Sequence, residues 1–441
     1  MIPIGKRGFA QGDTAVAPPG RTHLRLSSFA DFVARPRVVV AIVVLLAVAF
    51  ALRAAVYFEA PKPLDGAGLA AEQGEIARNI VDHGDWFVVN SKAFELLKDQ
   101  QAHQHRLVDP GSVDFAGVDR KSTAEPVVDQ MPGVALILAG LWWTTGKETY
   151  AQIQWLQILL DTVMVLLVYW IALRLARSTR VALLAAVLYA LWPGAVIVAK
   201  RPVLDTWAGF FTIGCVGAFV WARDHPTSRW RLILLGLVTG AGIYFRPFVL
   251  FIPIALALVA TPGGGWRRRL LWMSAPTLVA LLVLAPWTIR NYYTFDRFIP
   301  TRTGLGQAVF EGAGQAQTDT HAKAYVQRHR KNAKYGSPAY DDFLLGGAAH
   351  AIADDPGGYF RLVARRARLL LPCLLVLLAW RRWRRAALIP VAAAAATILP
   401  YLLIGDDARF YLPAAFAYFI LIAMTLEIAV STLARRRATV P

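Results

Sequence analysis

The sequence has few of the residues that usually hold metal ions or form disulfides. Its 441 residues include two cysteines and eight histidines. Cys215 and Cys373 both lie inside apolar runs, so they provide neither a disulfide framework nor a zinc-binding spacing. The histidines of the polar segments, such as His103 and His105, follow no ligand spacing. We therefore expect no metal site and no cofactor.

A glycine-rich phosphate loop is also missing. Gly304, Gly306, Gly312 and Gly314 lie close together in the sequence. They lack the preceding strand, the Lys-Ser/Thr pair and the following helix that a P-loop requires. We therefore do not interpret this stretch as a nucleotide-binding loop.

Long apolar runs are what the sequence has in abundance. Hydrophobic residues make up 56% of the chain, and Val38 to Phe58 is a run interrupted only by Arg53. At ~1.5 Å per residue, a helix of this length crosses the ~30 Å hydrocarbon core of a bilayer. A cleaved signal peptide is the alternative, but the preceding segment is too long and too polar for one. The run is therefore interpreted as a retained membrane anchor.

Further apolar runs follow along the chain. They are Ile153–Leu173, Val181–Ala199, Val203–Ala222, Leu232–Phe245, Pro247–Ala260, Leu270–Ile289, Leu369–Trp380, Ala386–Ile404 and Phe410–Leu433. Some of them are shorter than a full span and are open to merging. The pattern predicts an all-α polytopic membrane protein with about 10 transmembrane helices, within a range of about 9 to 12.

Basic residues outnumber acidic ones, and their placement explains why. Lys and Arg number 47 against 29 Asp and Glu, which gives a net charge of +18. The arginines gather between the apolar runs, at 35–37, 174–180, 223–231, 267–269, 381–385 and 435–437. With ten spans and a cytoplasmic N-terminus, all of these clusters fall on the cytoplasmic side, as the positive-inside rule expects. The charge therefore indicates membrane topology, and we expect no nucleic-acid partner.

This topology divides the chain into alternating membrane and polar parts. We expect a cytoplasmic tail (1–37), a first transmembrane helix (38–57), a first periplasmic loop (58–131), a juxtamembrane helix with transmembrane helices (132–289), a second periplasmic loop (290–368), C-terminal transmembrane helices (369–433) and a cytoplasmic tail (434–441). The short run "GVALILAGLWWTTG" opens the fourth part. Were it a full span, the later arginine clusters would lie outside, so it is interpreted as re-entrant or juxtamembrane.

The first loop holds thirteen of the 29 acidic residues. A solvated acidic loop would account for most of them. It accounts less well for the helical pattern in which Leu69, Ile76 and Ile80 line one face, while Glu72 and Glu75 follow a neighbouring stripe. The pattern predicts an amphipathic helix at the membrane surface that offers carboxylates to the interface.

The order of several short motifs resembles that of a known family. They are "EQGEIARN", "DQMPG", "KRPVLDTW", "GLVTGAGIYFRP", "APWTIRNYYTFDRFIPTRTGLG" and "DDARFYLP". Together they resemble the C-type (GT-C) glycosyltransferases that use polyprenyl-phosphate sugars, and most of all the bacterial relatives of protein O-mannosyltransferases and lipid A aminoarabinose transferases. The chain departs from this family at Leu69 and Ala70, where many members have an Asp-Glu pair. It also departs at Gln130 and Met131, where the family has Lys-Pro.

The resemblance implies a fold and an activity. It implies a GT-C-like fold with juxtamembrane helices in the first outside loop. The implied enzyme is an inverting glycosyltransferase that moves a hexose or pentose from a polyprenyl-phosphate-sugar donor lipid to a glycan, lipid or protein acceptor. It would work at the outer face of the bacterial cytoplasmic membrane, among membrane lipids. A ligase or polymerase with a polyprenyl-diphosphate donor, and a lipid or solute transporter, remain as alternatives.

The resemblance also selects candidate residues. Such a reaction needs a carboxylate base for the acceptor and cations for the departing phosphate. Glu72 is the first candidate for the base, ahead of Glu75, Asp65 and Asp129; Asp129 is alternatively a helix N-cap. The candidates for donor binding are Arg78, Arg201, Asp205, Arg290, Arg365, Arg366 and Arg409. Binding of lipid headgroups by Arg365 and Arg366, and local ion pairs at Arg201, Asp205 and Arg409, are the competing interpretations.

Overall fold

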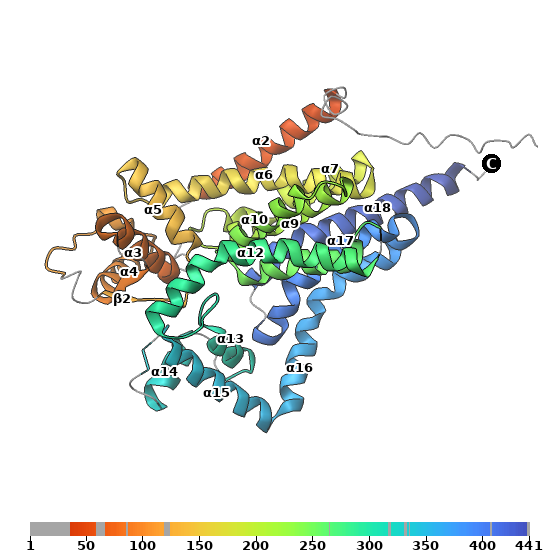
Figure 1. The fold of residues 1–441 in the computed structure, drawn as a ribbon. Helices are drawn as coiled ribbons and strands as arrows, with labels where there is room; N and C mark the ends of the chain where they lie inside the picture. The colour runs from red at the N-terminus through yellow and green to blue at the C-terminus, as the bar shows by residue number, and fades with distance from the viewer. Residues whose placement is uncertain are drawn as a thin grey trace, which may run out of the picture. The chain divides into compact units, whose positions relative to one another are not determined.

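The computed structural model describes most of the chain as helices. The described residues are 36–58, 67–84, 87–118, 124–263, 265–315, 319–329, 333–334, 336–405 and 408–438. The chain divides into two units, Met1–Ala41 and Ile42–Pro441. The second unit contains all helices except the first turns of α2 (Figure 1).

The helices vary widely in length. They are, in chain order, α2 (Pro36–Phe58), α3 (Ala67–His83), α4 (Ser91–Gln104), α5 (Gly133–Thr145), α6 (Ala151–Ala176), α7 (Thr179–Ala190), α8 (Pro193–Val198), α9 (Asp205–Asp224), α10 (Trp230–Ile243), α11 (Phe251–Ala260), α12 (Trp266–Phe295), α13 (Leu305–Gly312), α14 (Asp319–His329), α15 (Pro338–Asp354), α16 (Pro356–Arg366), α17 (Leu375–Ile404) and α18 (Ala415–Ala438). Short 3₁₀ helices are η1 (Pro110–Ser112), η2 (Pro247–Leu250), η3 (Ala367–Leu374) and η4 (Ala408–Ala414). Strands β1 (Val88–Asn90) and β2 (Ala124–Pro126) form a small antiparallel pair in the first loop.

Among the described residues, five helical segments are long and apolar enough to cross a membrane. They are Pro36–Phe58, Ala151–Ala176, Trp266–Phe295, Arg382–Ile404 and Tyr411–Arg435. Shorter apolar helices accompany them at Gly133–Thr145, Thr179–Ala190, Trp230–Ile243 and Pro247–Ala260. The predicted all-helical polytopic membrane fold is thereby confirmed. The apolar run 181–199 does not form one helix, because Pro193 ends the continuity and starts α8.

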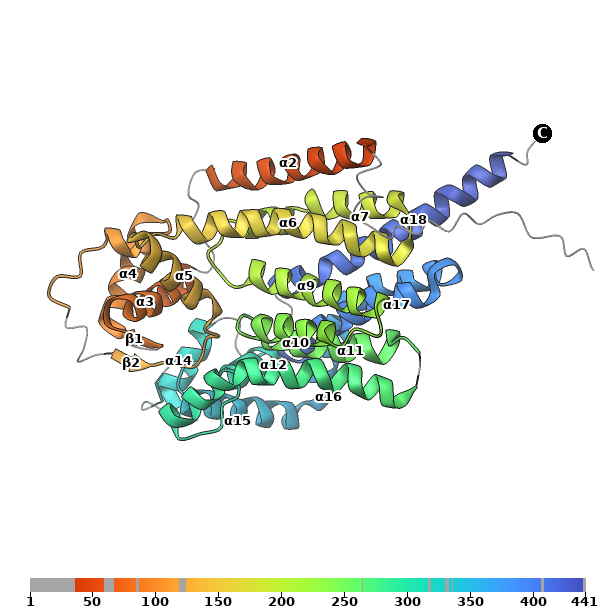
Figure 2. The ribbon, with the colours of Figure 1, turned by 45° about the horizontal axis from the view of Figure 1, so that its top comes forward.

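Close helix packing explains the glycines of the "GLVTGAGI" motif. Gly236 and Gly240 lie one turn apart on α10, against α12 (Figure 2). A Cβ at Gly236 would lie 2.5 Å from Cβ of Val279, and one at Gly240 would lie 2.6 Å from Cβ of Val283. Small residues allow membrane helices to approach in this way, because association in lipid depends on close packing. The motif therefore has a structural role.

Two buried charged residues inside the apolar spans form a pair. Arg53 of α2 forms an ion pair with Asp161 of α6, and both side chains are buried. Tyr189 of α7 donates a hydrogen bond of 2.8 Å to Asp161 Oδ1, and Arg53 Nη1 donates one of 3.1 Å to the carbonyl of Ala190. An unpaired charge within a bilayer costs at least a few kcal/mol. The network therefore accounts for the one arginine that interrupts the first apolar run.

Helix α3 is more enclosed than its sequence pattern predicts. The apolar face packs on α5, where Ala70 and Ala77 join a core cluster with Leu138. The neighbouring polar stripe is also covered, since Glu75 and Asn79 are each 1% exposed. Helices α4 and α5 both pack on α3 and leave it little free surface. Of the two carboxylates expected at the interface, Glu75 is therefore covered by protein, whereas Glu72 is half-buried.

The second loop forms a small helical layer of its own. Helices α13, α14 and α15 share a core cluster that includes Phe310, Val326, Tyr340 and Leu344. Thr303, just before α13, donates its backbone N–H to the carbonyl of Val128 at 3.0 Å. This hydrogen bond joins the second loop to the end of the first. The two polar loops thus meet, although some 170 residues separate them in the sequence.

Candidate active site

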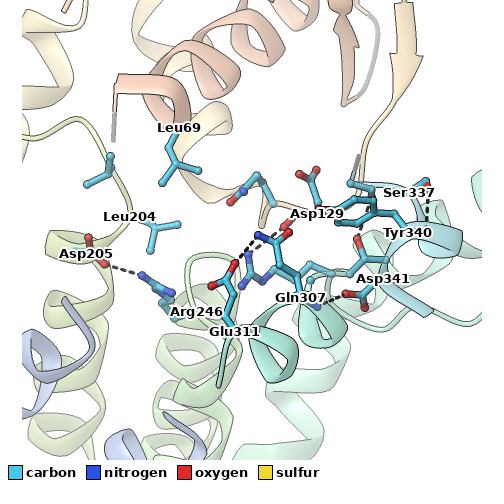
Figure 3. Close-up of a pocket in the computed structure, with 17 residues that line it drawn as sticks. Leu69, Asp129, Leu204, Asp205, Arg246, Gln307, Glu311, Ser337, Tyr340 and Asp341 are labelled. Carbon is cyan, nitrogen blue, oxygen red and sulfur yellow. Dashed lines mark hydrogen bonds and ion pairs between the residues drawn. The ribbon is translucent and has the colours of Figure 1, made fainter. Parts of the chain in front are cut away.

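A cavity of about 180 Å³ lies where the two loops meet the bundle. Its charged lining residues come from five parts of the chain and are Asp129, Asp205, Arg246, Arg302, Glu311 and Asp341 (Figure 3). The volume is below the ~300–1,000 Å³ of sites for drug-sized ligands. The cavity therefore suits a small, polar group with several hydrogen-bonding partners.

One wall carries a buried ion pair. Arg246, which follows α10, donates from Nη2 to Oδ1 of Asp205 at 2.7 Å. Asp205 is the first residue of α9, where a carboxylate interacts favourably with the helix dipole. The structure thus brings one predicted donor-binding residue, Asp205, to the cavity. Its partner Arg246 was not among the predicted site residues, although it stands in the "YFRP" stretch.

A pair of carboxyl groups lies on the side of α3. Glu72 and Asp129 share a side-chain hydrogen bond. Burial raises the pKa of Glu72 well above its usual range, and the charge of Asp129 raises it further. Burial also raises the pKa of Asp129. A hydrogen bond between two carboxyl groups requires a proton on one of them. Two of the four predicted base candidates are therefore brought together.

Two cations from the second loop face this carboxyl pair. The charges of Arg302 and Lys323 act on both Glu72 and Asp129 and lower the pKa of each. Arg302 Nη1 also donates a hydrogen bond of 3.0 Å to the carbonyl of Asp129. Burial lowers the pKa of Arg302, as does the charge of Arg246 nearby. Arg246, Arg302 and Lys323 therefore place positive charge around the cavity and its carboxyl pair.

The wall opposite the bundle carries acceptors for hydrogen bonds. The backbone N–H of Gln307 donates to Oδ1 of Asp341 at 3.2 Å, and its side-chain amide donates to Oε1 of Glu311 at 2.9 Å. These residues join α13 to α15 beside the cavity. Carboxylate and amide groups in this arrangement are suited to a ligand with several hydroxyl groups.

The remaining candidates of the first loop have structural partners. Glu75 accepts a hydrogen bond of 3.2 Å from Asn79 and is not among the residues that line the cavity. Arg78 forms ion pairs with Glu148 at 3.1 Å and Asp82 at 3.4 Å. These contacts join α3 to the segment that precedes α6. Neither residue contributes to the cavity.

The predicted arginines also divide into different environments. Arg290 donates to the carbonyls of Val127 and Phe87, at 2.9 and 2.8 Å. Arg366 donates to the carbonyls of Leu402 and Gly312, at 3.1 and 2.6 Å. Both therefore hold backbone segments around the cavity without lining it.

Other candidates stand apart from the cavity. Arg365 is exposed on α16, and Arg201 is half-buried in the turn before α9. Asp65 lies outside the described residues, and so does the side chain of Arg409. Within the described ranges, no group of three or more His, Cys, Asp or Glu residues is arranged to hold a metal ion.

Three residues at or beside the cavity were not predicted from the sequence, although two of them stand in the quoted motifs. Arg246 and Arg302 both stand in motif stretches, "YFRP" and "TRTGLG", but nothing in those stretches predicts that they line one cavity. Lys323 lies on α14, a polar helix of the second loop that belongs to none of the motifs. Its position beside the carboxyl pair follows from the meeting of the two loops.

Comparison with known proteins supports the resemblance seen in the motifs. Residues 131–296 match the profile of the dolichyl-phosphate-mannose-protein mannosyltransferase family. The undecaprenyl phosphate-α-4-amino-4-deoxy-L-arabinose arabinosyl transferase of Erwinia tasmaniensis is 30% identical over 166 residues, 34% of this chain and 29% of that protein. The corresponding protein of Pseudomonas paraeruginosa is 31% identical over 165 residues, again 34% of this chain and 30% of that protein. The chain thus spans under a third of the length of these relatives.

The fold also has a counterpart among solved structures. The oligosaccharyltransferase of Archaeoglobus fulgidus in the apo form superposes with a TM-score of 0.54 and 13% identity, over 91% of this chain and 51% of that one. The predicted resemblance to GT-C proteins is therefore confirmed, and the chain has a polytopic membrane fold of that kind. Asp205 and Arg246 fall within the family match, whereas Glu72, Asp129 and Arg302 lie outside it.

Proposed function

We propose that this protein is an inverting glycosyltransferase that uses a polyprenyl-monophosphate sugar as its donor. The observation that carries the proposal is the carboxyl pair Glu72–Asp129 beside Arg302 and Lys323, next to a small polar cavity. The names of the relatives support this donor class, since they include an undecaprenyl phosphate sugar.

The proposed reaction assigns complementary tasks to the two kinds of charge. The carboxyl pair supplies the base that accepts the proton of the acceptor. Arg246, Arg302 and Lys323 stabilise the negative charge that develops on the departing phosphate. Gln307, Glu311 and Asp341 hydrogen-bond the hydroxyl groups of the sugar. A single displacement at the anomeric carbon inverts its configuration.

The membrane placement of the site is part of the proposal. A donor of this class keeps its prenyl tail in lipid and its phosphate at the interface. Both loops contribute to the cavity, and the arginine pattern predicts that both lie on the side opposite the cytoplasm. We infer that the site faces the periplasm of a bacterium, across the inner membrane. The exposed Arg365 on α16 would contact anionic lipid headgroups there.

The proposed acceptor is defined only by its chemistry, as a molecule with a nucleophilic hydroxyl group. The cavity's several hydrogen-bonding groups suit the sugar of the donor, and the acceptor would approach from the outside. A glycan, a lipid or a protein with a nucleophilic hydroxyl meets this requirement. Its hydroxyl must reach the carboxyl pair, because the base acts at hydrogen-bonding distance.

A donor panel tests the proposal. Purified protein in nanodiscs is incubated with polyprenyl-monophosphate donors that carry different hexoses and pentoses, together with an extract of envelope glycans and lipids. Release of free polyprenyl phosphate with at least one donor is the expected result, scored by mass spectrometry. An absence of release with every monophosphate donor, together with turnover of a polyprenyl-diphosphate donor, would replace the proposal by the ligase alternative.

A further inference from the structure

The two carboxyl groups of the pair do not face the cavity equally. Asp129 is among the residues that line it, whereas Glu72 is not. Asp129 is 8% exposed, and its Oδ1 has no hydrogen-bond partner among the described residues. A buried carboxylate oxygen is costly without a donor, so a ligand hydroxyl at this position would be stabilised. Asp129 is therefore the member of the pair that a ligand in the cavity can reach.

The surroundings of the pair also differ between its members. Burial raises the pKa of both, but the charge of Asp129 and the shared hydrogen bond raise that of Glu72 further. Four interactions lower the pKa of Asp129: a hydrogen bond with its own backbone, the charge of Arg302, the hydrogen bond with Glu72 and the charge of Lys323. Arg302 Nη1 donates its hydrogen bond of 3.0 Å to the backbone carbonyl of Asp129, and both residues line the cavity. A cation beside Asp129 favours the charged form of this carboxyl group, and hence a proton on Glu72.

We propose that Asp129 takes the proton of the acceptor, and that Glu72 is a protonated positioning residue that donates a hydrogen bond to it. The inference rests on the proposed function, because it requires an acceptor hydroxyl in the cavity. In this step the acceptor oxygen bonds to the anomeric carbon while the bond from that carbon to the phosphate oxygen breaks. The electron pair leaves with the phosphate, and the proton moves to Asp129.

This assignment fixes the pH dependence of the reaction. The active pair carries one proton, on Glu72, and faces the cations Arg302 of the second loop and Lys323 of α14. As the pH falls, Asp129 becomes protonated and stops acting as a base; because its pKa is raised, this occurs above the usual range of an Asp. As the pH rises, Glu72 loses its proton, and the hydrogen bond becomes a repulsion between two carboxylates. The rate should therefore fall on both sides of an optimum.

Three variants separate the two roles. Asp129→Asn keeps the shape but accepts no proton, so turnover should fall by ~10²–10⁴, the usual contribution of a general base. Glu72→Gln still donates a hydrogen bond, so turnover should fall by no more than about tenfold, the effect of one weakened hydrogen bond. The alkaline side of its pH profile should flatten, because an amide does not ionise. Glu72→Ala, which removes the donor, should be slower than Glu72→Gln.

The controls keep this inference separate from the proposed function. Glu95→Gln, on the exposed side of α4, removes a carboxylate of the same loop and should leave turnover unchanged. Size-exclusion profile and donor affinity verify that each variant is folded. If Glu72→Gln loses as much turnover as Asp129→Asn, or if Asp129→Asn loses less than tenfold, the inference is overturned while a working wild-type enzyme upholds the function. A wild-type enzyme that releases no polyprenyl phosphate overturns both.

Discussion

Among single residues, Arg302 has the position best suited to the leaving group. It lines the cavity, donates to the carbonyl of Asp129 and faces the carboxyl pair. Arg302→Gln should therefore lower turnover by ~10²–10³, the effect of removing one preorganised charge-stabilising donor. Steady-state release of polyprenyl phosphate measures this loss.

A matched arginine from the same loop provides the control. Arg297 forms an exposed ion pair with Asp342 at 2.7 Å and lies away from the cavity. Arg297→Gln should retain wild-type turnover, since exposed ion pairs contribute only ~0–1 kcal/mol. Equal turnover in the two variants would remove Arg302 from the mechanism.

The sequence predicted individual residues of the site where a short motif held them. Glu72 and Asp129 each stand in a stretch that resembles a family motif, and Asp205 does as well. Their partners were not predictable in the same way. Arg302 and Lys323 come from the second loop, and their proximity to Glu72 depends on how two distant loops pack. Arg290 and Arg366, both predicted to bind the donor, donate hydrogen bonds to backbone carbonyls.

At the scale of helices, the contact between α13 and α15 shapes one wall of the cavity. A Cβ added at Gly306 of α13 would lie 1.9 Å from the carbonyl oxygen of Asp341 on α15. Gly306→Ala must therefore separate the two helices, at an overpacking cost of ~1–3 kcal/mol. We expect a lower melting temperature and at least tenfold lower turnover, because Gln307 and Asp341 move apart.

Gly346 on the same helix pair is the control for that substitution. Apart from the nearby backbone of its own helix, no atom of the described residues lies within 4 Å of a Cβ built at Gly346. Gly346→Ala should leave turnover unchanged and raise or preserve the melting temperature, because Ala is favoured over Gly in a helix by up to ~1 kcal/mol. If Gly306→Ala behaves like Gly346→Ala, the close contact between α13 and α15 does not shape the site.

The sequence correctly predicted that these segments are helices, but it did not predict how they are packed or where they break. Apolar periodicity identified the helix that became α3, but its polar stripe of Glu75 and Asn79 is buried. The pattern could not indicate that α4 and α5 would cover both of its sides. Likewise, hydropathy joined α7 and α8 into one run, because apolar composition continues across the break that Pro193 makes.

For the whole molecule, the two loops must share one side of the membrane. Cys215 and Cys373 are buried, so single cysteines added at exposed positions report topology. Ser112→Cys and His350→Cys, one in each outside segment, should react with an impermeant maleimide in intact spheroplasts. Thr227→Cys, between α9 and α10, should react only after permeabilisation.

Labelling of Thr227→Cys in intact cells, or protection of either outside position, would contradict the shared side. The two loops would then require a topology in which a further segment spans the membrane. That segment would be α5. We assign it to one side of the membrane because its 13 residues are fewer than the ~17–25 of a usual span.

The architecture as a whole was the most predictable level. Long apolar runs and alternating arginine clusters indicated a polytopic helical fold, and the order of motifs indicated the GT-C resemblance. Both signals are spread over many residues, so an error at one position does not change the predicted architecture. The cavity depends on contacts among five separate segments, and no local pattern encodes such a meeting.

The central claim is tested most directly by a competition between donors. Wild-type protein receives equimolar polyprenyl-monophosphate and polyprenyl-diphosphate forms of the same sugar with the same prenyl chain, and mass spectrometry counts both released carriers. We expect polyprenyl phosphate as the main released carrier, in a 1:1 ratio with transferred sugar, and loss of this release in Asp129→Asn. Predominant release of polyprenyl diphosphate, or equal release from wild type and Asp129→Asn, would contradict it.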